Sequence, residues 1–367
     1  MNVYAAIDPD QSTRAGAAIS VLRGRAAFEQ LQPEWDRLFA RAALPHQLFQ
    51  SHRLLSAWAQ SYDQDQEMIV VTAREHSALV AVLPLTMRQT MGIKRLQFMG
   101  MPIAQFGDML VDPHCSAGTA DAVWAHVAAI GADVMEARRV RADSAMWRFA
   151  EGGIVIERME APFARLAQRV SGDQPGPAYS GRDRSNLRRR QRRLEERGRL
   201  TLNIDPAADT VALAALAVDI KRRSLSKARI LSPVVKARGF EAFFRKAAAD
   251  PQSGLIVSTI DLDGKPIAID LSFLCKGVAF GHVLAIEPAF QKDGAGNLLV
   301  HHVFARAAGA GAEVFDLLAP ADAYKMHHAD GVTKIESRVY PFTARGRLFA
   351  LAFHGMAMPA ARAMLRR

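Results

Sequence analysis

Apolar residues recur at two different spacings along this chain, and the spacings predict its helices and strands. Residues 33–42 and 51–62 carry apolar positions every three or four residues, which is typical of helices that bury one face. Residues 67–90 hold two apolar runs around a polar turn at 74–77, which predicts a β-hairpin. The other elements predicted in this half are strands at 93–100, 108–113 and 153–159 and a helix at 117–132.

The second half follows a break in this pattern. Residues 171–183 are dense in Gly, Pro, Ser and Asp and predict a linker. Beyond it the pattern predicts helices at 182–199, 207–227 and 234–249, strands at 254–261, 265–275 and 277–287, a helix at 295–309, a strand at 313–319, a helix at 321–329 and a strand at 334–342. Each half offers a hairpin followed by strand, helix and strand, so we expect two halves with a shared mixed α/β plan.

Composition agrees with two soluble domains. The chain has 367 residues, 50% of them apolar and 23% charged, which is more length than one core usually holds. No apolar run is long enough to span a bilayer, and the first residues lack the basic and apolar regions of a signal peptide. Cys115 and Cys275 are the only cysteines, which argues against a disulfide framework and favours a reducing cytoplasm.

The charge balance indicates an anionic partner. A net charge of +10 suits a phosphate-bearing cofactor, nucleic acid, an acidic polymer or the inner membrane surface.

Nine arginines and three acidic residues lie within 182–199. On a helix, Leu187 and Leu194 fall on one face while Arg188 and Arg192 fall on another. This helix is either a solvated arm packed through its leucines or a site where Arg188 and Arg192 bind a phosphorylated or acidic substrate, such as a glycan precursor. It has no interleaved aromatic residues, so tRNA is a weaker candidate. Binding of cyclic di-GMP by this helix would be supported only by the spacing of its arginines.

A glycine-rich turn between a strand and a helix is the most informative motif. A strand ending near Ile286 and a helix starting near Gly296 would point the free N–H groups of that helix at the turn, where they favour an anion. Gly294 and Gly296 would let the backbone approach a pyrophosphate, and Gln291 or Lys292 would add a donor. The alternative is an ordinary turn whose glycines serve only backbone geometry.

The stretch 286–299 resembles the signature of the GNAT acyltransferase superfamily, with Pro288, Phe290, Gln291, Gly294 and Gly296 in the matching places. The resemblance implies that amides of this turn hold the pyrophosphate of acetyl-CoA. The expected carrier-binding residues are Ile286, Gln291, Lys292, Asp293, Gly294, Ala295, Gly296 and Asn297. Residues 321–332 look like the helix whose tyrosine protonates the departing thiolate in many members, which implies that Tyr324 is the general acid. The spacing from Tyr324 to Gly331 is longer than the family usually has.

Acetyl transfer to an amine also needs a general base. The candidates are His282, Glu287 and Asp270, each with a structural alternative: a core histidine, a solvated turn and a buried acid. Asp316 interrupts an apolar run and demands a partner, for which a substrate amine is one candidate. Lys325 is either a substrate or CoA contact or an exposed lysine. The histidine pairs at 301–302 and 327–328 lack zinc-site spacing, so no metal is predicted.

Further stretches at 34–38, 48–62, 82–85, 107–113, 187–198 and 316–325 look like the bacterial CelD/BioF2-like acetyltransferase group, which is related to the Fem peptidoglycan aminoacyl transferases. The resemblance implies two tandem GNAT-like domains, each a mixed and mainly antiparallel sheet flanked by helices. The expected limits are 18–170, a linker at 171–183, a carrier-binding domain at 184–346 and a tail at 347–367.

The function implied is an acetyl-CoA-dependent N-acyltransferase acting on an amino sugar or related exopolysaccharide or cell-envelope precursor. Two alternatives stay open: a Fem-type transferase that uses aminoacyl-tRNA, and a non-catalytic module that responds to a nucleotide. The expected location is the cytoplasm, with attachment to the inner membrane surface left open.

Overall fold

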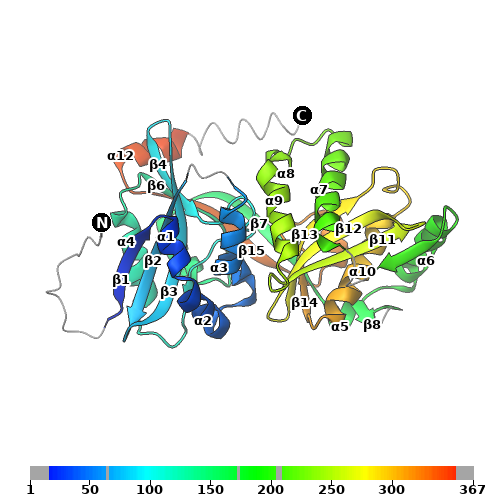
Figure 1. The fold of residues 1–367 in the computed structure, drawn as a ribbon, viewed down its shortest axis with the longest axis horizontal. Helices are drawn as coiled ribbons and strands as arrows, with labels where there is room; N and C mark the ends of the chain where they lie inside the picture. The colour runs from blue at the N-terminus through cyan, green and yellow to red at the C-terminus, as the bar shows by residue number, and fades with distance from the viewer. Residues whose placement is uncertain (1–15, 63–65, 172–173, 204–208, 353–367) are drawn as a thin grey trace.

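The computed structural model describes residues 16–62, 66–171, 174–203 and 209–352. Within these ranges, twelve strands follow one another side by side in a single sheet, in the order β1-β2-β3-β4-β6-β15-β7-β14-β13-β12-β11-β10, and β5 pairs with β3. Figure 1 shows this sheet running through both halves of an elongated molecule. The predicted mixed sheet flanked by helices is confirmed, although the two halves share one continuous sheet.

The first half supplies most strands of one end of the sheet. Its strands are β1 (Ala18–Arg23), β2 (Glu67–Glu75), β3 (Ala78–Thr90), β4 (Ile93–Phe98), β5 (Leu110–Val111), β6 (Val134–Arg141) and β7 (Ile154–Arg165). Its helices are α1 (Arg25–Gln30), α2 (Gln32–Ala42), α3 (His52–Ala59) and α4 (Thr119–Ala129), with 3₁₀ turns η1 (Pro45–Gln50) and η2 (Ala145–Gly152). The predicted hairpin at 67–90 is confirmed as β2 and β3. The strands β1 and β6 were not predicted.

The second half begins after a short two-stranded ribbon in the predicted linker. The connecting elements are α5 (Leu166–Arg169), β8 (Val170–Ser171) and β9 (Gln174–Pro175). The elements that follow are α6 (Gly181–Glu195), β10 (Leu200–Asn203), α7 (Thr210–Lys227), α8 (Pro233–Lys236), α9 (Arg238–Ala249), β11 (Leu255–Leu262), β12 (Lys265–Cys275), β13 (Val278–Ile286), α10 (Ala295–Gly309), β14 (Val314–Asp316), α11 (Ala323–His328), β15 (Gly331–Pro341) and α12 (Ala344–Phe349).

The last strand returns to the first half. β15 pairs antiparallel with both β6 and β7, so residues 331–341 lie among strands of the N-terminal half, whereas the sequence placed them in a domain spanning 184–346. The end of β7 in turn pairs with β14 of the second half. The strands that flank α11 in the chain, β14 and β15, therefore lie on either side of β7 in the sheet.

Alternation along β12 sets the two faces of the sheet in the second half. Ile269, Leu271 and Phe273 join a core with α7 and α9, while Ala268 joins a second core with α10. Asp270 falls on the α10 side by the same alternation. The sheet therefore holds a buried carboxyl group, with the Ser272 hydroxyl hydrogen-bonded to it, on the side that α10 covers.

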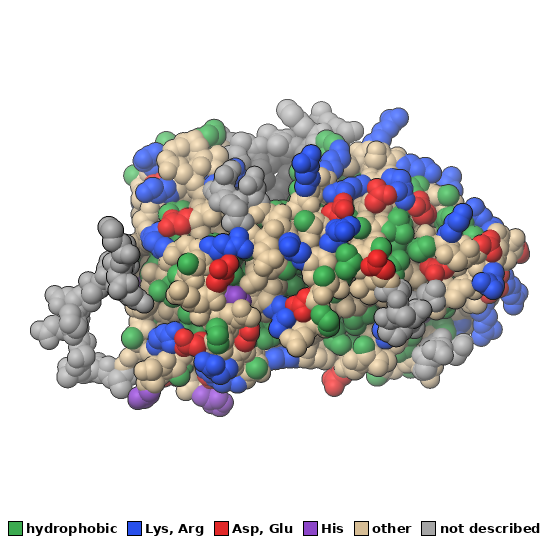
Figure 2. Space-filling model, viewed as in Figure 1, with side chains coloured by type: hydrophobic (Ala, Val, Ile, Leu, Met, Phe, Trp, Pro, Cys, Tyr) green, Lys and Arg blue, Asp and Glu red, His purple; other side chains and the backbone are tan. Residues whose placement is uncertain are grey.

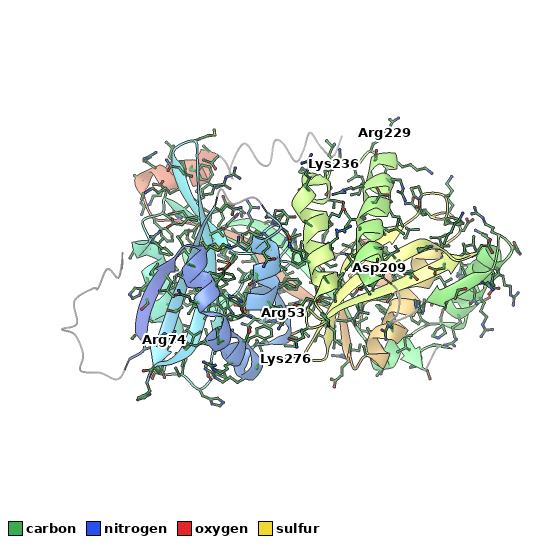
Figure 3. The ribbon with its side chains drawn as sticks, viewed as in Figure 1. Arg53, Arg74, Asp209, Arg229, Lys236 and Lys276 are labelled. Carbon is green, nitrogen blue, oxygen red and sulfur yellow. The ribbon has the colours of Figure 1, made fainter. Side chains whose placement is uncertain are left out.

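Two cations tie the halves together beside the sheet. Nη1 of Arg53 lies 2.7 Å from Oδ2 of Asp250. Nζ of Lys276 donates to three carbonyl groups around the end of α2, those of Phe39, Ala40 and Ala43. Figure 3 shows Arg53 and Lys276 near each other where the halves meet.

The arginine-rich helix α6 begins at a side-chain cap. Ser180 accepts a hydrogen bond from the amide of Asp183, and the Asp183 carboxylate accepts one from the amide of Ser180. Leu187 and Leu194 are buried, which confirms the predicted packing face. Figure 2 shows Lys and Arg side chains gathered at the right-hand end of the molecule, where Figure 1 places α6.

No helix among the described residues is both long enough and apolar enough to cross a bilayer. Most of the predicted tail, residues 353–367, lies outside the described residues.

Candidate active site

The glycine turn joins β13 to α10 as predicted. Gly294 precedes the helix with φ 87°, a left-handed conformation that favours glycine. The amides of Asn297 and Leu298 both donate to the carbonyl of Gly294. Within the described part of the chain, the amides of Ala295 and Gly296 donate no hydrogen bond. These two N–H groups lie at the positive end of α10, where they would favour an anion, although Ala295 itself is fully buried.

Both glycines of the motif are also places of close packing. A Cβ on Gly296 would lie 2.6 Å from Cδ1 of Ile286, and one on Gly294 would lie 2.5 Å from Cδ of Arg190. Real Cβ contacts are essentially never this short. The glycines thus let α10 approach the end of β13 and let α6 lie against the turn.

Several side chains of the turn already have partners outside any cavity. Gln291 donates through Nε2 to Oγ of Ser224 at 2.6 Å. Asp293 is ion-paired with Arg197. Lys292 is exposed and Ala295 is buried. Of the predicted carrier-binding side chains, the structure brings only Asn297 into the cavity described next.

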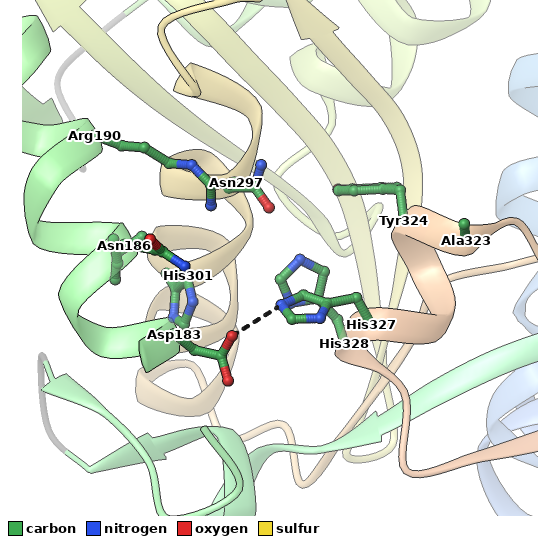
Figure 4. A pocket seen from close by; sticks show the side chains of 10 residues that line it. Asp183, Asn186, Arg190, Asn297, His301, Ala323, Tyr324, His327 and His328 are labelled. Carbon is green, nitrogen blue, oxygen red and sulfur yellow. Dashed lines mark ion pairs between the residues drawn. The ribbon is translucent and has the colours of Figure 1, made fainter. Parts of the chain in front are cut away.

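A cavity of ≈ 390 Å³ lies between α6, α10 and α11. Figure 4 shows Arg190 of α6 and Asn297 of α10 on one side of it, with Tyr324 of α11 across from them. The residues that line it are Asp183, Asn186, Leu187, Arg190, Asn297, His301, Ala323, Tyr324, His327 and His328. Apart from Asn297 and Tyr324, none of these polar residues was predicted.

Two histidines of this cavity are uncharged at neutral pH. Burial, reinforced by the nearby His327, lowers the pKa of His301 to about 4 and that of His328 to about 3. Nδ1 of His328 is hydrogen-bonded to the Tyr179 hydroxyl at 2.8 Å. Because His301 and His328 are neutral, the fixed charges that line the cavity are the positive charge of Arg190 and the negative charge of Asp183.

A second, smaller pocket of ≈ 50 Å³ adjoins the first through Tyr324, which lines both. Its polar side chains are Asp270, Tyr324 and Lys325. The rest of the lining is glycine or apolar: Gly281, Leu284, Val300, Val303, Phe304, Phe315 and Leu317. We call this space the inner pocket and the larger space the outer cavity.

Burial sets the protonation of the inner pocket. It raises the pKa of Asp270 to about 7, against the opposing effect of the Ser272 hydroxyl, which donates to Oδ2. Burial and the Asp270 charge together raise the pKa of Tyr324 well above its usual range. At neutral pH, Asp270 therefore exchanges a proton readily while Tyr324 keeps its own.

Lys325 and Asp316 have protein partners. Nζ of Lys325 donates to the carbonyls of Leu318 (2.8 Å) and Pro320 (3.1 Å), so it holds the loop before α11. Asp316 pairs with Nη1 of Arg141 at 2.6 Å. The partner that its burial demands is an arginine of the N-terminal half.

The other candidates lie away from the inner pocket. His282 lies on the α9 side of the sheet, against Phe244 and Phe273, where Nε2 meets the Ile103 carbonyl at 2.9 Å and burial lowers its pKa to about 4. Glu287 is ion-paired with Arg223. Arg188 and Arg192 are exposed on α6 and do not line the outer cavity. Among the predicted acid–base residues, the structure brings together Asp270 and Tyr324 alone.

Three or more metal-binding side chains do not converge anywhere in the described ranges.

Comparisons with known proteins bear on the second half most directly. Residues 181–326 match the family described as "Acetyltransferase (GNAT) domain". No curated protein matches the sequence.

Solved structures with a similar fold span most of the chain. FemX is 9% identical with a TM-score of 0.58, and the match covers 90% of this chain and 99% of FemX. L-PGS from Bacillus licheniformis is 11% identical with a TM-score of 0.51, over 91% and 97% of the two chains. A tandem GNAT protein from the clavulanic acid biosynthesis pathway is 13% identical with a TM-score of 0.50, over 89% and 99%. At identities this low, the likeness to these structures shows a shared fold alone.

Proposed function

Because residues 181–326 match the GNAT acetyltransferase domain, we propose that this protein transfers an acetyl group from acetyl-CoA to an amine at the inner pocket. The observation that carries the proposal is the position of Tyr324. Its side chain lines both the outer cavity and the inner pocket, and it shares the inner pocket with Asp270. A donor in the outer cavity would thus meet both an acid and a base.

The residues of the outer cavity fit an anionic carrier. The guanidinium of Arg190 lines the outer cavity and favours a diphosphate, against the Asp183 carboxylate that lines it too. The amides of Ala295 and Gly296 do not line the cavity, but they lie at the positive end of α10 next to Asn297, which does. Asn297 adds an amide side chain beside them. The carrier supplies an activated thioester, and the chain's own residues supply its binding and the proton transfers.

Asp270 and Tyr324 divide the proton transfers. The amine nitrogen forms a bond to the thioester carbonyl carbon while Asp270 takes a proton from that nitrogen. The carbon–sulfur bond then breaks, and Tyr324 gives its proton to the departing sulfur. Asp270 suits the first step because its pKa of about 7 lies near neutral pH. Tyr324 suits the second because it is fully protonated there.

The acceptor we propose is an amino sugar or a related exopolysaccharide or cell-envelope precursor. This step is supported by the resemblance to the CelD/BioF2-like group, and by a net charge of +10 that favours an anionic partner. Fold likeness alone does not identify a substrate.

A second candidate is a Fem-type transferase that takes its acyl group from aminoacyl-tRNA. It is favoured by the FemX-like fold and by exposed arginines along the outer face of α6, namely Arg182, Arg188, Arg189, Arg192 and Arg193. tRNA binding through these arginines would weaken steeply as salt rises. Acetyl-CoA binding in the outer cavity depends on fewer charges and would weaken less.

Calorimetric titration with acetyl-CoA tests the proposal. We expect the unchanged protein to bind it and Arg190→Gln to bind it at least roughly tenfold more weakly, since a charged hydrogen bond is worth about 1.5–3 kcal/mol. Arg189→Gln is the matched control, because Arg189 is the exposed neighbour on the same helix. Failure of the unchanged protein to bind acetyl-CoA would remove the proposal and leave the tRNA-dependent candidate.

A further inference from the structure

The connection between α7 and α8 presents two adjacent apolar side chains to solvent. Ile230 is 53% exposed and Leu231 is 69% exposed. Figure 1 shows the ends of α7 and α8 that this connection joins at one edge of the molecule. Single exposed apolar residues are common on protein surfaces, whereas two together at the end of a helix pair indicate a surface that contacts something.

The two helix ends hold this connection in place. The amides of Arg229 and Ile230 both donate to carbonyl groups in the last turns of α7. Arg229 has a φ of 55°, the left-handed conformation that such a helix ending requires. On the other side, the Ser232 side chain accepts a hydrogen bond from an amide of α8 and caps that helix. Ile230 and Leu231 are therefore held between two capped helix ends.

The surroundings of the apolar pair are strongly basic. Residues 220–240 contain seven lysines and arginines and no aspartate or glutamate. Two of these arginines, both on α7, are ion-paired with acidic residues outside the stretch. Arg229, Lys236 and Arg238 are exposed, and no carboxylate of the described residues lies within ion-pair distance of them. Their charges are therefore available to a partner.

A second set of hydrogen bonds places α8 beside the end of α7. Nε of Arg222 donates to the carbonyl of Val235 at 3.0 Å, and Nη2 donates to that of Ala237 at 3.3 Å. Figure 3 shows Arg229 and Lys236 at the same end of these helices. The apolar pair and the cations thus form one surface, which we call the α7–α8 tip and define as Arg229, Ile230, Leu231, Lys236 and Arg238.

This combination of side chains fits an anionic lipid surface. Apolar side chains enter the boundary between headgroups and acyl chains, while cations around them meet the charged headgroups. The tip has no aromatic side chain on which a nucleobase could stack, so a nucleic acid fits its chemistry less well. The charge and the exposed apolar pair together therefore favour a membrane.

We propose that the α7–α8 tip docks the protein on a membrane surface that carries anionic lipids, with Ile230 and Leu231 entering the headgroup region. The inference does not depend on the proposed function, because no residue of the tip lines either cavity. Helix α7 also contacts the glycine turn, where Ser224 accepts a hydrogen bond from Gln291. Docking through the tip would therefore hold the C-terminal half at the lipid surface.

The test is co-sedimentation of the full-length protein with vesicles of phosphatidylcholine, with and without phosphatidylglycerol. We expect binding to the vesicles that contain phosphatidylglycerol, and this binding should weaken as salt rises. Arg229→Gln/Lys236→Gln should weaken it at least roughly tenfold, since each cation near an anionic surface contributes a factor of about five. Ile230→Ser/Leu231→Ser should also weaken it at least roughly tenfold, because two apolar side chains no longer leave water.

Matched variants elsewhere measure the unspecific part of the binding. Arg245→Gln/Lys246→Gln removes two exposed cations from the second half of α9, away from the tip, and should keep most of the binding. Leu348→Ser removes an apolar side chain of α12 that is 70% exposed and should keep all of it. Equal losses in the tip variants and these controls, or no binding of the unchanged protein to either kind of vesicle, would overturn the proposal.

Fluorescence separates insertion of the tip from loose electrostatic contact. Leu231→Trp places an indole at the tip, and indole side chains favour the membrane interface. Its emission should move to shorter wavelength when vesicles containing phosphatidylglycerol are added, by more than the emission of the unchanged protein moves. An emission that stays at the water-exposed value while the protein is bound would show that the tip does not enter the headgroup region, against the proposal.

Other partners of the tip would give different results. A dimer seen by sedimentation velocity without vesicles, and dissociated by Ile230→Ser/Leu231→Ser, would assign the apolar pair to a second copy of the chain. Binding of tRNA but not of vesicles, weakened by Arg229→Gln/Lys236→Gln, would assign the cations to a nucleic acid. Either result would overturn the proposal.

Acetyl-CoA titration of the same samples separates this inference from the proposed function. The tip does not line the outer cavity, so its variants should bind acetyl-CoA with the affinity of the unchanged protein. Their Tm should also be unchanged, because the substituted side chains are exposed. Loss of vesicle binding with both properties intact supports the docking surface. Failure of every sample to bind acetyl-CoA would count against the proposed function and would leave the vesicle result standing.

Discussion

Arg141 and Asp316 form a buried ion pair, with 2.6 Å between Nη1 and Oδ2, although they lie 175 residues apart and in opposite halves of the chain. Asp316 is the last residue of β14 and also accepts a hydrogen bond from the amide of Leu318. The guanidinium lies over the ring of Phe106, 4.6 Å from its centre. The pair thereby fixes the segment that leads to α11 and Tyr324 against the N-terminal half.

Arg141→Met should lower the free energy of unfolding by about 3–5 kcal/mol, because it leaves the Asp316 carboxylate buried without a counter-charge. Arg141→Met combined with Asp316→Leu should recover much of that loss, since apolar replacement of a whole buried pair is often tolerated. Urea unfolding of both variants and of the unchanged protein measures the difference. A double variant no more stable than Arg141→Met would show that the pair is not the source of the loss.

Asp270→Asn should lower kcat by roughly 10²–10⁴-fold, the usual contribution of a general base. In the unchanged protein, kcat/KM should rise with pH and level off above the Asp270 pKa of about 7, because only the ionised carboxylate accepts the proton. A pH–rate profile with each variant measures both effects. A midpoint near the ordinary aspartate value of 3.8 would contradict the assignment.

The same raised pKa predicts how stability changes with pH. The folded protein holds the Asp270 proton more tightly than the unfolded chain, so the stability linked to this proton is fully present below pH 3.8 and is lost as pH rises through about 7. The amide introduced by Asp270→Asn has no such proton to lose. Relative to the unchanged protein, Asp270→Asn should therefore gain a few kcal/mol between pH 4 and 7 and then stay level. Urea unfolding at several pH values shows whether the two curves diverge over that interval.

The helices and strands could largely be predicted because their apolar spacing is local. The site was harder, because its contacts depend on how distant segments pack. The position of Arg190 could have been predicted from the sequence, because it lies three residues after Leu187 and four before Leu194, on the buried face of α6. No feature of the sequence indicated that Arg141 would be the partner of Asp316. This pairing depends on β15 returning to the first half, which no local pattern indicates.

Tyr324→Phe should lower kcat by roughly 10²–10⁴-fold while the dissociation constant for acetyl-CoA stays the same, because the variant loses only the proton given to the thiolate. Burial and the Asp270 charge keep the hydroxyl protonated, so the loss should be similar throughout the neutral range of pH. Release of free CoA thiol measures the rate, and calorimetry measures the binding. An unchanged kcat would mean that another donor, or water, protonates the leaving group.

Gly296→Ala should weaken acetyl-CoA binding and lower the free energy of unfolding by about 1–3 kcal/mol, because its Cβ would lie 2.6 Å from Cδ1 of Ile286 and push α10 away from β13. Ile286→Val removes that methyl group, so the double variant Gly296→Ala/Ile286→Val should recover most of both losses. Gly309→Ala is the matched control at the other end of α10, where an added Cβ meets nothing within 4 Å. Calorimetry and urea unfolding of the unchanged protein, the two single variants and the double variant complete a double-mutant cycle. If Ile286→Val gave no rescue, the glycine would be required for something other than this contact, and close approach of the carrier to its backbone would be the remaining physical reason for it.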